Sequence, residues 1–249
     1  MTGLAKDPLL KMEKINKWFE SIQAVNDVDF EVYPGETVLL VGDNGAGKST
    51  LIKMLSGYHQ PTSGEIYFEG QKVIITSVEC ARKLGIETVY QERAIVGSSS
   101  VAKNVFLGRE PTRAFGPIKI VDSKLMKEKS FSAVNEGLGL NISSMDQEAR
   151  FCSGGEQQGI AIARALLFKY KLVILDEPTN ALSVSGVRQV QEFIKELGKK
   201  GIASIIITHS LSCIYPICDR IVALSRGSKI LDKAKSEISL QELENTLLD

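Results

Sequence analysis

The stretch from Gly42 to Thr50, G-D-N-G-A-G-K-S-T, has glycines, a lysine and two hydroxyl residues at a spacing that suits phosphate binding. It fits the pattern G-x-x-x-x-G-K-[ST]. The glycines at 42, 45 and 47 permit positive φ and leave room for an anion, so that successive N–H groups form a phosphate nest. Lys48 then reaches the β- and γ-phosphates, and the Ser49 hydroxyl binds Mg²⁺. The alternative is a glycine-rich turn that binds nothing.

The residues on either side of this loop favour the phosphate-binding interpretation. Residues 37–41, T-V-L-L-V, form a short apolar and β-branched run that predicts a buried strand. Residues 49–56 then predict a helix, with Leu51, Ile52 and Leu55 on one face. Strand, glycine-rich turn and helix start are the local structure that a phosphate loop requires.

Two other predicted strands end in residues that can do chemistry. Residues 171–178 read K-L-V-I-L-D-E-P, so Asp176 and Glu177 stand at the end of a buried strand. His209 follows a second apolar run, 203–207, in the same position. Ligands of open α/β sheets bind at these strand ends. Asp176 suits Mg²⁺ and Glu177 suits a water, although polar strand ends and a structural histidine remain the alternatives.

Three further groups have both a structural and a functional interpretation. Ser153 to Glu156 forms the capping box S-x-x-E, yet its glycines also expose N–H groups to an anion. Gln91 ends a predicted strand and is either a polar strand end or part of a site. Phe19, beside Trp18, is either packing or a stacking surface for a nucleotide base. His59 has no such context, and we expect it to be structural.

The composition limits the classes of protein that this chain can belong to. It has 249 residues, 43% of them hydrophobic, and 30 basic against 30 acidic residues. This balance disfavours a nucleic-acid binder, and we expect no nucleic-acid partner. No apolar run is long enough to span a bilayer, and no signal peptide is predicted. The four cysteines have no C-x-x-C spacing, so reduced thiols in a cytosolic chain are expected.

The order of the predicted elements indicates an α/β fold with a mostly parallel sheet. Residues 10–32 and 65–76 predict antiparallel strands, and 219–231 predict an edge hairpin. Between residues 92 and 154 the pattern changes. Residues 101–107, residues 123–138 and a short piece near Ser144 look helical, and strand signals are nearly absent. We therefore predict a mainly helical subdomain inserted into the α/β core.

Taken in order, these motifs closely resemble those of the ATP-binding-cassette ATPases over nearly the whole chain. The resemblance rests on the phosphate loop, Gln91, the S-G-G stretch at 153–155 and D-E-P-T at 176–179. It implies a single P-loop domain over 1–249 with an antiparallel β subdomain. The nucleotide-binding core is then 9–91 and 155–235, the helical insertion 92–154, and the helical tail 236–249.

The resemblance also implies a mechanism in which two copies dimerise head to tail around ATP. Glu177 is then the general base, His209 contacts the γ-phosphate, and Gln91 senses the metal and the attacking water. Mg²⁺ is held by Ser49, Gln91 and Asp176. The residues implied to bind ATP are Phe19, Gly42, Asp43, Asn44, Gly45, Ala46, Gly47, Lys48, Ser49, Thr50, Ser153, Gly154, Gly155 and Glu156.

Three positions depart from the family pattern. The usual Leu-Ser-Gly-Gly-Gln is Cys152-Ser153-Gly154-Gly155-Glu156, which puts a carboxylate where the family has an amide. Glu156 can still accept from ribose hydroxyls. The aspartate that usually follows D-E-P-T-x-A-L is Ser183, which affects the expected coupling between the two copies and the rate, but not ATP binding.

Residues 101–111 and 181–184 resemble simple-sugar importers with a single cassette. This implies permease subunits in the membrane as partners, an extracytoplasmic sugar-binding protein acting indirectly, and a peripheral position on the cytoplasmic face. The alternatives are a soluble cassette such as an iron–sulfur cluster assembly ATPase, which also carries S-G-G-E, and a nucleotide-binding module without hydrolysis. Pro178-Thr179 after the two carboxylates favours the transporter pattern.

Overall fold

The computed structural model describes residues 7–90, 95–168, 170–180 and 182–248. These residues form two compact units. The larger unit comprises Met1–Thr88, Tyr170–Glu177 and Leu197–Asp249, and the smaller unit comprises Val89–Lys169 and Pro178–Glu196. The predicted insertion at 92–154 lies inside the smaller unit, which also takes in residues predicted to belong to the core. The proposed domain boundaries remain a prediction.

A six-stranded sheet with the order β12-β11-β3-β10-β9-β6 forms the frame of the larger unit. Strands β11, β3, β10 and β9 pair in parallel, and β12 pairs antiparallel with β11. The prediction of a mostly parallel sheet is therefore confirmed. The strands are β3 (Thr37–Val41), β6 (Ile86–Val89), β9 (Leu172–Asp176), β10 (Ala203–Ile207), β11 (Arg220–Ser225) and β12 (Ser228–Ala234).

The central strands are apolar along their whole length because both of their faces are covered. Every residue of β3 and β10 is buried, and so are the first four residues of β9. Continuous Val, Ile and Leu runs are typical of such strands. The helices of this unit are α1 (Lys48–Leu55), α2 (Val78–Leu84), α7 (Leu211–Ile214), α8 (Leu240–Leu248) and the short turns Tyr215–Ile217 and Lys235–Glu237.

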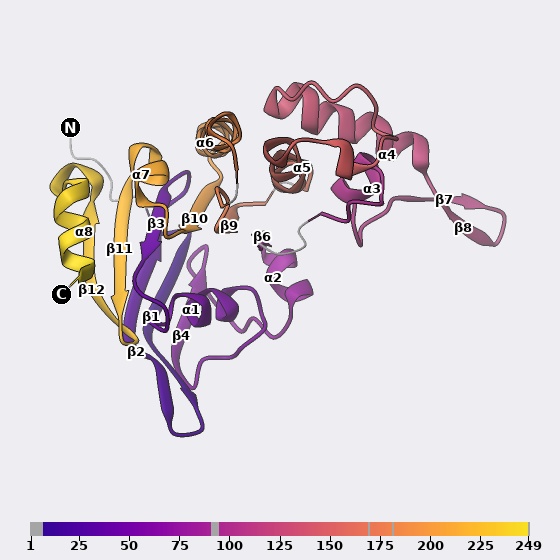
Figure 1. Cartoon of the computed structure of the whole chain (residues 1–249). Coiled ribbons are helices and arrows are strands. Elements are labelled where there is room, and N and C mark those ends of the chain that lie inside the picture. Colours follow the sequence, from indigo (N-terminus) through magenta and orange to yellow (C-terminus); the bar gives the residue numbers. More distant parts are fainter. Residues whose placement is uncertain (1–6, 91–94, 169, 181, 249) are drawn as a thin grey trace, which may run out of the picture. The chain divides into compact units, whose positions relative to one another are not determined.

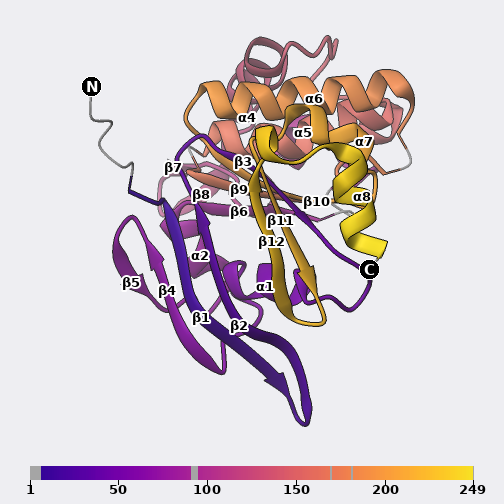
Figure 2. The same ribbon diagram turned by 90° about the vertical axis from the view of Figure 1, so that its left-hand side faces the viewer.

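A second, antiparallel sheet has the order β2-β1-β4-β5 (Figure 2). Its strands are β1 (Leu10–Phe19), β2 (Ile22–Val32), β4 (Ser63–Phe68) and β5 (Gln71–Val73). Its inner residues, among them Met12, Phe30 and Phe68, join one hydrophobic core with Leu51 of α1 and Leu40 of β3. The predicted antiparallel subdomain is confirmed, and the shared core fixes it to the sheet that carries the loop.

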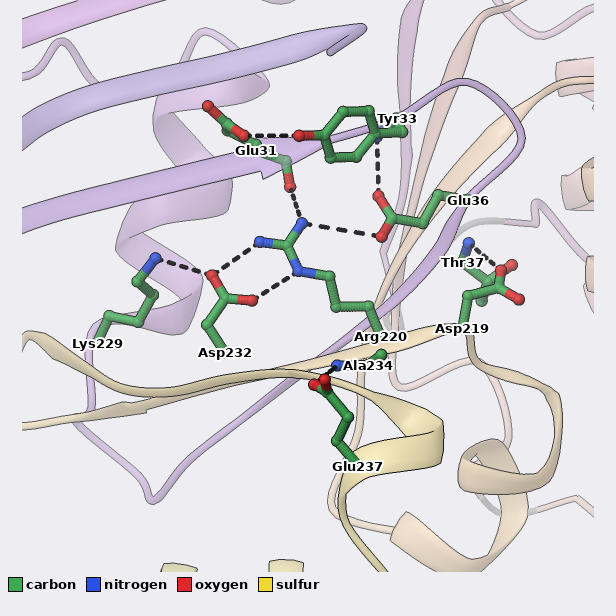
Figure 3. A network of polar contacts seen from close by, with 10 residues as sticks. All are labelled: Glu31, Tyr33, Glu36, Thr37, Asp219, Arg220, Lys229, Asp232, Ala234 and Glu237. Carbon is green, nitrogen blue, oxygen red and sulfur yellow. Dashed lines mark hydrogen bonds and ion pairs between the residues drawn. The ribbon is translucent and has the colours of Figure 1, made fainter. Parts of the chain in front are cut away.

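A network of polar contacts also ties the two sheets of the larger unit together (Figure 3). Arg220 of β11 donates to both carboxylate oxygens of Asp232 on β12, over 2.6 and 2.7 Å, and to the backbone oxygen of Glu31 on β2. Burial alone would raise the pKa of Asp232, but hydrogen bonds from Arg220 and Lys229 hold that pKa below its usual value. The ion pair thus fixes the β11–β12 hairpin against the end of β2.

The smaller unit is mainly helical, as predicted. Its helices are α3 (Val101–Val105), α4 (Ser123–Phe131) with a π-helical extension (Ser132–Glu136), the turn Ala149–Phe151 and α5 (Gly154–Leu167). Most of α6 (Val184–Lys199) also belongs to it, and the last turn of α6 belongs to the larger unit. Gly159 of α5 packs on Phe193 of α6 so closely that a side chain at 159 would begin 2.7 Å from the ring.

The expectation that strands are nearly absent from this region is wrong for one segment. Strands β7 (Thr112–Phe115) and β8 (Ile118–Val121) form an antiparallel hairpin that extends away from the helices of the same unit (Figure 1). Phe115 and Ile118, which face each other across the turn, are exposed. The sequence carries only a weak signal for this hairpin, the turn dipeptide Gly116-Pro117 followed by β-branched residues, because runs of four residues are too short to show a clear period.

The predicted helical piece near Ser144 is also wrong. Residues 141–148 form an irregular loop with one turn at 145–146, and the buried Ile142 and Met145 supply the three-residue spacing that resembles a helix. The side chain of Asn135 bonds both the N–H and the C=O of Ile142, in place of helical hydrogen bonds.

In the described part of the chain, none of the helices is long and apolar enough to cross a membrane.

Candidate nucleotide-binding site

The predicted phosphate loop joins β3 to α1, as the motif requires. Gly42 has φ +139°, and a side chain there would begin 2.1 Å from the backbone oxygen of Leu224 in β11. Gly47 has φ +101° and would meet the backbone oxygen of Ala24 at 2.5 Å. Both contacts are with main chain, which cannot move aside as a flexible side chain can. These two positions therefore require glycine for packing as well as for conformation.

Lys48 is the last residue of the loop to precede the Ser49 hydroxyl, and its ammonium bonds to backbone oxygens of the same loop. Its Nζ donates to the carbonyl oxygens of Gly42 and Asp43 over 2.6 and 2.9 Å. Burial lowers the pKa of Lys48, and the negative charges of Glu177, Asp43 and Asp176 act in the opposite direction. A phosphate bound in the loop would give the Lys48 ammonium an anionic partner in place of these two backbone carbonyls, through a charge-assisted hydrogen bond.

The start of α1 adds donors to the same place. Its N-cap is Gly47, which has no side chain to accept from the first-turn N–H groups. Such groups carry partial positive charge and bind anions. The adjacent Ser49 is exposed, and its hydroxyl belongs to this first turn. A pocket of about 550 Å³ borders the outer side of the loop, between Asn44, Arg226 of the β11–β12 turn and Thr246 of α8.

Asp176 and Glu177 stand at the carboxyl end of β9, beside the end of β10. Asp176 pairs with Ile207 across the parallel ladder, and the N–H of Glu177 donates to the Ile207 oxygen over 2.8 Å. Burial, and then the negative charge of Glu177, raise the pKa of Asp176, while Lys48 opposes this rise. Two adjacent carboxylates in a half-buried place favour a bound cation.

Glu177 is held in one orientation by three contacts from the residues after β10. Its Oε2 accepts from the Thr208 hydroxyl at 3.1 Å, and its Oε1 accepts from the His209 N–H at 3.0 Å. The His209 Nε2 lies 3.5 Å from the same Oε1. Glu177 has φ +50°, a left-handed conformation that costs a non-glycine residue about 1–3 kcal/mol. Backbone strain of this kind is typical of functional positions.

Phe19, the predicted base-stacking residue, lies at the end of β1 and is exposed. Lys17 places its Nζ 5.0 Å from the centroid of the Phe19 ring, and the same Nζ donates to the backbone oxygen of Gln60. The His59 ring meets the Phe19 ring edge to face, with the centroids 5.1 Å apart. His59 thus lies beside a candidate site residue, although no motif in the sequence predicts this contact. Trp18 is also exposed.

The S-G-G-E stretch begins α5 in the smaller unit. The Ser153 hydroxyl accepts from the Glu156 N–H, and the Glu156 carboxylate accepts from the Ser153 N–H at 2.7 Å, which completes the predicted capping box. A side chain at Gly155 would begin 2.9 Å from the Cα of Gly186 in α6. These glycines therefore also serve the packing of α5 on α6, and one carboxylate oxygen of Glu156 is used within its own helix.

The structure thus brings the phosphate loop, Asp176, Glu177 and His209 together at one end of the central strands of the larger unit. Ser153 to Glu156 belong to the smaller unit and are described there by themselves. Gln91 lies outside the described residues. Among the described residues there is no group of three or more His, Cys, Asp or Glu side chains that could hold a metal.

The phosphate loop is also held by backbone hydrogen bonds from residues that no sequence motif identifies. Gly227, in the β11–β12 turn, donates to the Ala46 oxygen over 3.1 Å, and its own oxygen accepts from the Asn26 N–H over 2.8 Å. The signal in the sequence is only the dipeptide Arg226-Gly227, which indicates a turn but not what the turn contacts. Thr208, which precedes His209, carries no sequence signal of its contact with Glu177.

Comparison with known proteins agrees with this geometry. The family model described as ABC transporter matches residues 25–180. The xylose/arabinose import ATP-binding protein of Sulfolobus acidocaldarius is 41% identical over 96% of this chain and 93% of its own length. The ribose import ATP-binding protein of Caldanaerobacter subterraneus subsp. tengcongensis is 40% identical, and the match spans 95% of this chain but only 47% of that protein.

Solved structures with the same fold are also ATP-binding cassettes. The crystal structure of a nucleotide-free cassette from an ABC transporter superimposes with a TM-score of 0.80, covers 98% of this chain and 96% of that one, and is 26% identical. A cassette solved in an ADP conformation gives a TM-score of 0.80 at 25% identity. A bacterial transporter cassette whose structure is dimeric has a TM-score of 0.74 at 22% identity and shares the fold.

Proposed function

The chain belongs to the ATP-binding-cassette family, whose transporter members bind and hydrolyse ATP, and we propose that it powers the import of a simple sugar through a separate membrane permease. The sugar assignment rests on relatives that are named as import ATP-binding proteins for xylose and arabinose, ribose, or fructose. Each of these matches covers 88% or more of this chain. No observation favours the iron–sulfur assembly alternative.

The chain spans about half the length of the ribose relatives but nearly all of the xylose/arabinose one. We propose that a second copy of this chain completes the ATP site, with Ser153-Gly154-Gly155 of one copy facing the phosphate loop of the other. The capping box of Ser153 and Glu156 fixes the shape of this helix start and occupies the N–H groups of those two residues, which leaves the N–H groups of Gly154 and Gly155 for a phosphate held by the other copy. The partners are then a permease, with a sugar-binding protein acting through it, at the cytoplasmic face of the membrane.

The single observation that carries the proposed mechanism is the position of Glu177. Its carboxylate lies in a half-buried place with the Lys48 ammonium, Asp176 and His209, and electrostatic interactions link all four groups. Each carboxylate oxygen receives one donor at about 3 Å, so each keeps a free lone pair. We assign Glu177 the role of the general base that takes a proton from the attacking water.

The other residues near the loop bind and orient the nucleotide. The loop N–H groups and Lys48 hold the phosphates, Phe19 stacks on the adenine, and His209 contacts the γ-phosphate. Asp43, Asn44, Gly45, Ala46 and Thr50 belong to the same loop and helix start. Gln91 keeps its predicted role as a sensor of the metal and the water. Phosphoryl transfer needs mainly positioning and charge neutralisation, which these groups supply.

The residues present fit Mg²⁺. Burial and the neighbouring Glu177 raise the pKa of Asp176, and a divalent cation beside this carboxylate would offset both causes. Mg²⁺ prefers hard oxygen ligands and keeps several waters, so one carboxylate and one hydroxyl are enough when phosphates complete the shell. Asp176 and Ser49 would hold it, with Gln91. When bound, the ion neutralises charge on the β- and γ-phosphates.

The variant Glu177→Gln tests this assignment. The amide keeps the shape of the side chain but cannot take a proton, so kcat should fall roughly 10²- to 10⁴-fold while ATP affinity is kept. Steady-state phosphate release and calorimetric titration measure the two quantities. Glu244→Gln on the exposed part of α8 is the matched control and should leave both unchanged. Parental turnover in Glu177→Gln would remove the base role.

Co-purification from solubilised membranes tests the partner. The tagged chain should bring down an integral membrane protein, and its ATPase activity should rise when that complex is supplied with a binding protein and a pentose. Recovery with soluble iron–sulfur assembly proteins instead would overturn the importer proposal but not the ATPase assignment.

A further inference from the structure

Thr208 lies in the segment that follows β10, between two groups that hold it in place. It is a buried threonine, with only 2% of its surface exposed. The Ser210 N–H donates to the Thr208 Oγ1 over 3.0 Å, and Oγ1 lies 3.1 Å from the Glu177 Oε2. A hydroxyl has one proton, and the bond from Ser210 occupies one of its acceptor positions. The Thr208 proton is therefore free to be donated to the carboxylate.

The second oxygen of Glu177 is fixed by the next residue. The backbone N–H of His209 donates to Oε1 over 3.0 Å. The carboxylate is thus held at both oxygens by consecutive residues of one segment, and the Glu177 N–H is bonded in turn to Ile207. Rotation of the carboxylate about its last bond would break both side-chain contacts. The β9–β10 pairing places these partners, which are 31 residues apart in the sequence.

We infer that Thr208 is a positioning residue for hydrolysis: its hydroxyl fixes the Glu177 carboxylate in the orientation from which it accepts the proton of the attacking water. The inference rests on the proposed role of Glu177 as the base. Thr208 itself touches neither nucleotide nor water in this account. Its contribution should therefore appear in kcat and not in the binding of ATP, because a misplaced base slows the chemical step without changing the phosphate contacts.

The variant Thr208→Val tests the inference because valine keeps the branched shape and removes only the hydroxyl. We expect kcat to fall about 10- to 100-fold, as for the loss of a hydrogen bond to a charged group, with KM and Kd for ATP within about twofold of the parent. Thr208→Ser restores the hydroxyl and should recover kcat to within about threefold. Thr208→Ala, which also lacks the hydroxyl, should be as slow as Thr208→Val.

Two further variants separate positioning from packing. Thr37 is a similarly buried threonine on β3, whose backbone N–H and C=O bond to the carboxylate and the N–H of Asp219. Valine keeps both of these backbone contacts, so Thr37→Val should keep parental kcat. In a Glu177→Gln background, adding Thr208→Val should cause no further fall, because the base that the hydroxyl orients is already gone. A thermal melt of each protein confirms that it is folded before its rate is used.

Each outcome decides between the possibilities. The inference is overturned if Thr208→Val keeps parental kcat, if Thr208→Ser is as slow as Thr208→Val, or if Thr208→Val slows the Glu177→Gln protein as much as it slows the parent. If Glu177→Gln is slow while Thr208→Val is not, only the role of Thr208 fails. If Glu177→Gln keeps full turnover, the base assignment fails first and the positioning role fails with it.

Discussion

The chain contains two glycine-rich helix starts, one before α1 and one before α5, and they are built in opposite ways. Before α1 the N-cap is Gly47 at φ +101°, and no side chain accepts from the first-turn N–H groups. Before α5 the N-cap is Ser153 at φ −61°, and Ser153 and Glu156 satisfy each other's N–H groups. The first helix start leaves its donors to an external anion, and the second supplies its own acceptors.

The glycines differ in the same way. Gly42, Gly45 and Gly47 of the phosphate loop have positive φ, and a side chain at 42 or 47 would meet a backbone oxygen. Gly154 and Gly155 have no positive φ and pack against α6 and the segment before it. The difference indicates that a shared composition, two or three glycines before a helix, suits anion binding in the place where we propose it and helix packing in the other. A proposed contact of the second start with a nucleotide therefore depends on a second copy of the chain.

Alanine substitutions at one glycine of each helix start should give the largest contrast. Gly42→Ala puts a Cβ 2.1 Å from the Leu224 oxygen at φ +139°, so it should cost at least about 3 kcal/mol of stability. Gly154→Ala meets only the end of the Leu182 side chain at 2.9 Å and gains helix propensity, so it should stay within about 1 kcal/mol of the parent. Urea denaturation measures both. Equal losses would mean that the two sites are alike in packing.

Lys48→Ala should separate binding from stability. Removing a charge-assisted contact to phosphate should weaken ATP binding by roughly 10- to 150-fold, or about 1.5–3 kcal/mol. Stability should change less than affinity, because the loss of the bonds to the Gly42 and Asp43 oxygens is partly offset when the buried ammonium, whose pKa is lowered by burial, is removed. Calorimetric titration and thermal melting give the two readings. The exposed Lys83 of α2 is the control, and Lys83→Ala should change neither. Unchanged affinity in Lys48→Ala would mean that the loop is not the site.

Ser153→Ala should have the smallest effect, confined to stability. Loss of the N-cap hydroxyl should cost about 1 kcal/mol, which lowers Tm by roughly 2–4 °C in a chain of this size. Glu156→Gln is the matched control, since glutamine also completes a capping box, and its Tm should stay within about 1 °C of the parent. Calorimetric ATP titration at monomer concentrations should give the parental Kd for both variants. A weakened Kd in the monomer would show that this helix start reaches the nucleotide within one chain.

The elements that could be predicted from the sequence are those that short-range patterns encode. Residues 37–56 identify the strand, the loop and the helix, because the glycine spacing and the apolar period are both local. The same holds for the buried strands that end at Asp176 and before His209, and for the Ser153 cap. These predictions require only the order of the residues along the chain.

Contacts between residues far apart in the sequence could not be predicted, because they depend on how the strands pair. Thr208 reaches Glu177 because β9 and β10 pair in one register, and Gly42 lies against Leu224 because β11 lies beside β3. The contact of His59 with Phe19 has the same origin. The β7–β8 hairpin was missed because each of its strands has only four residues, too few to show a clear period between helical segments. Local residue types determine where strands form. The pairing of strands far apart in the sequence determines which residues contact each candidate catalytic side chain.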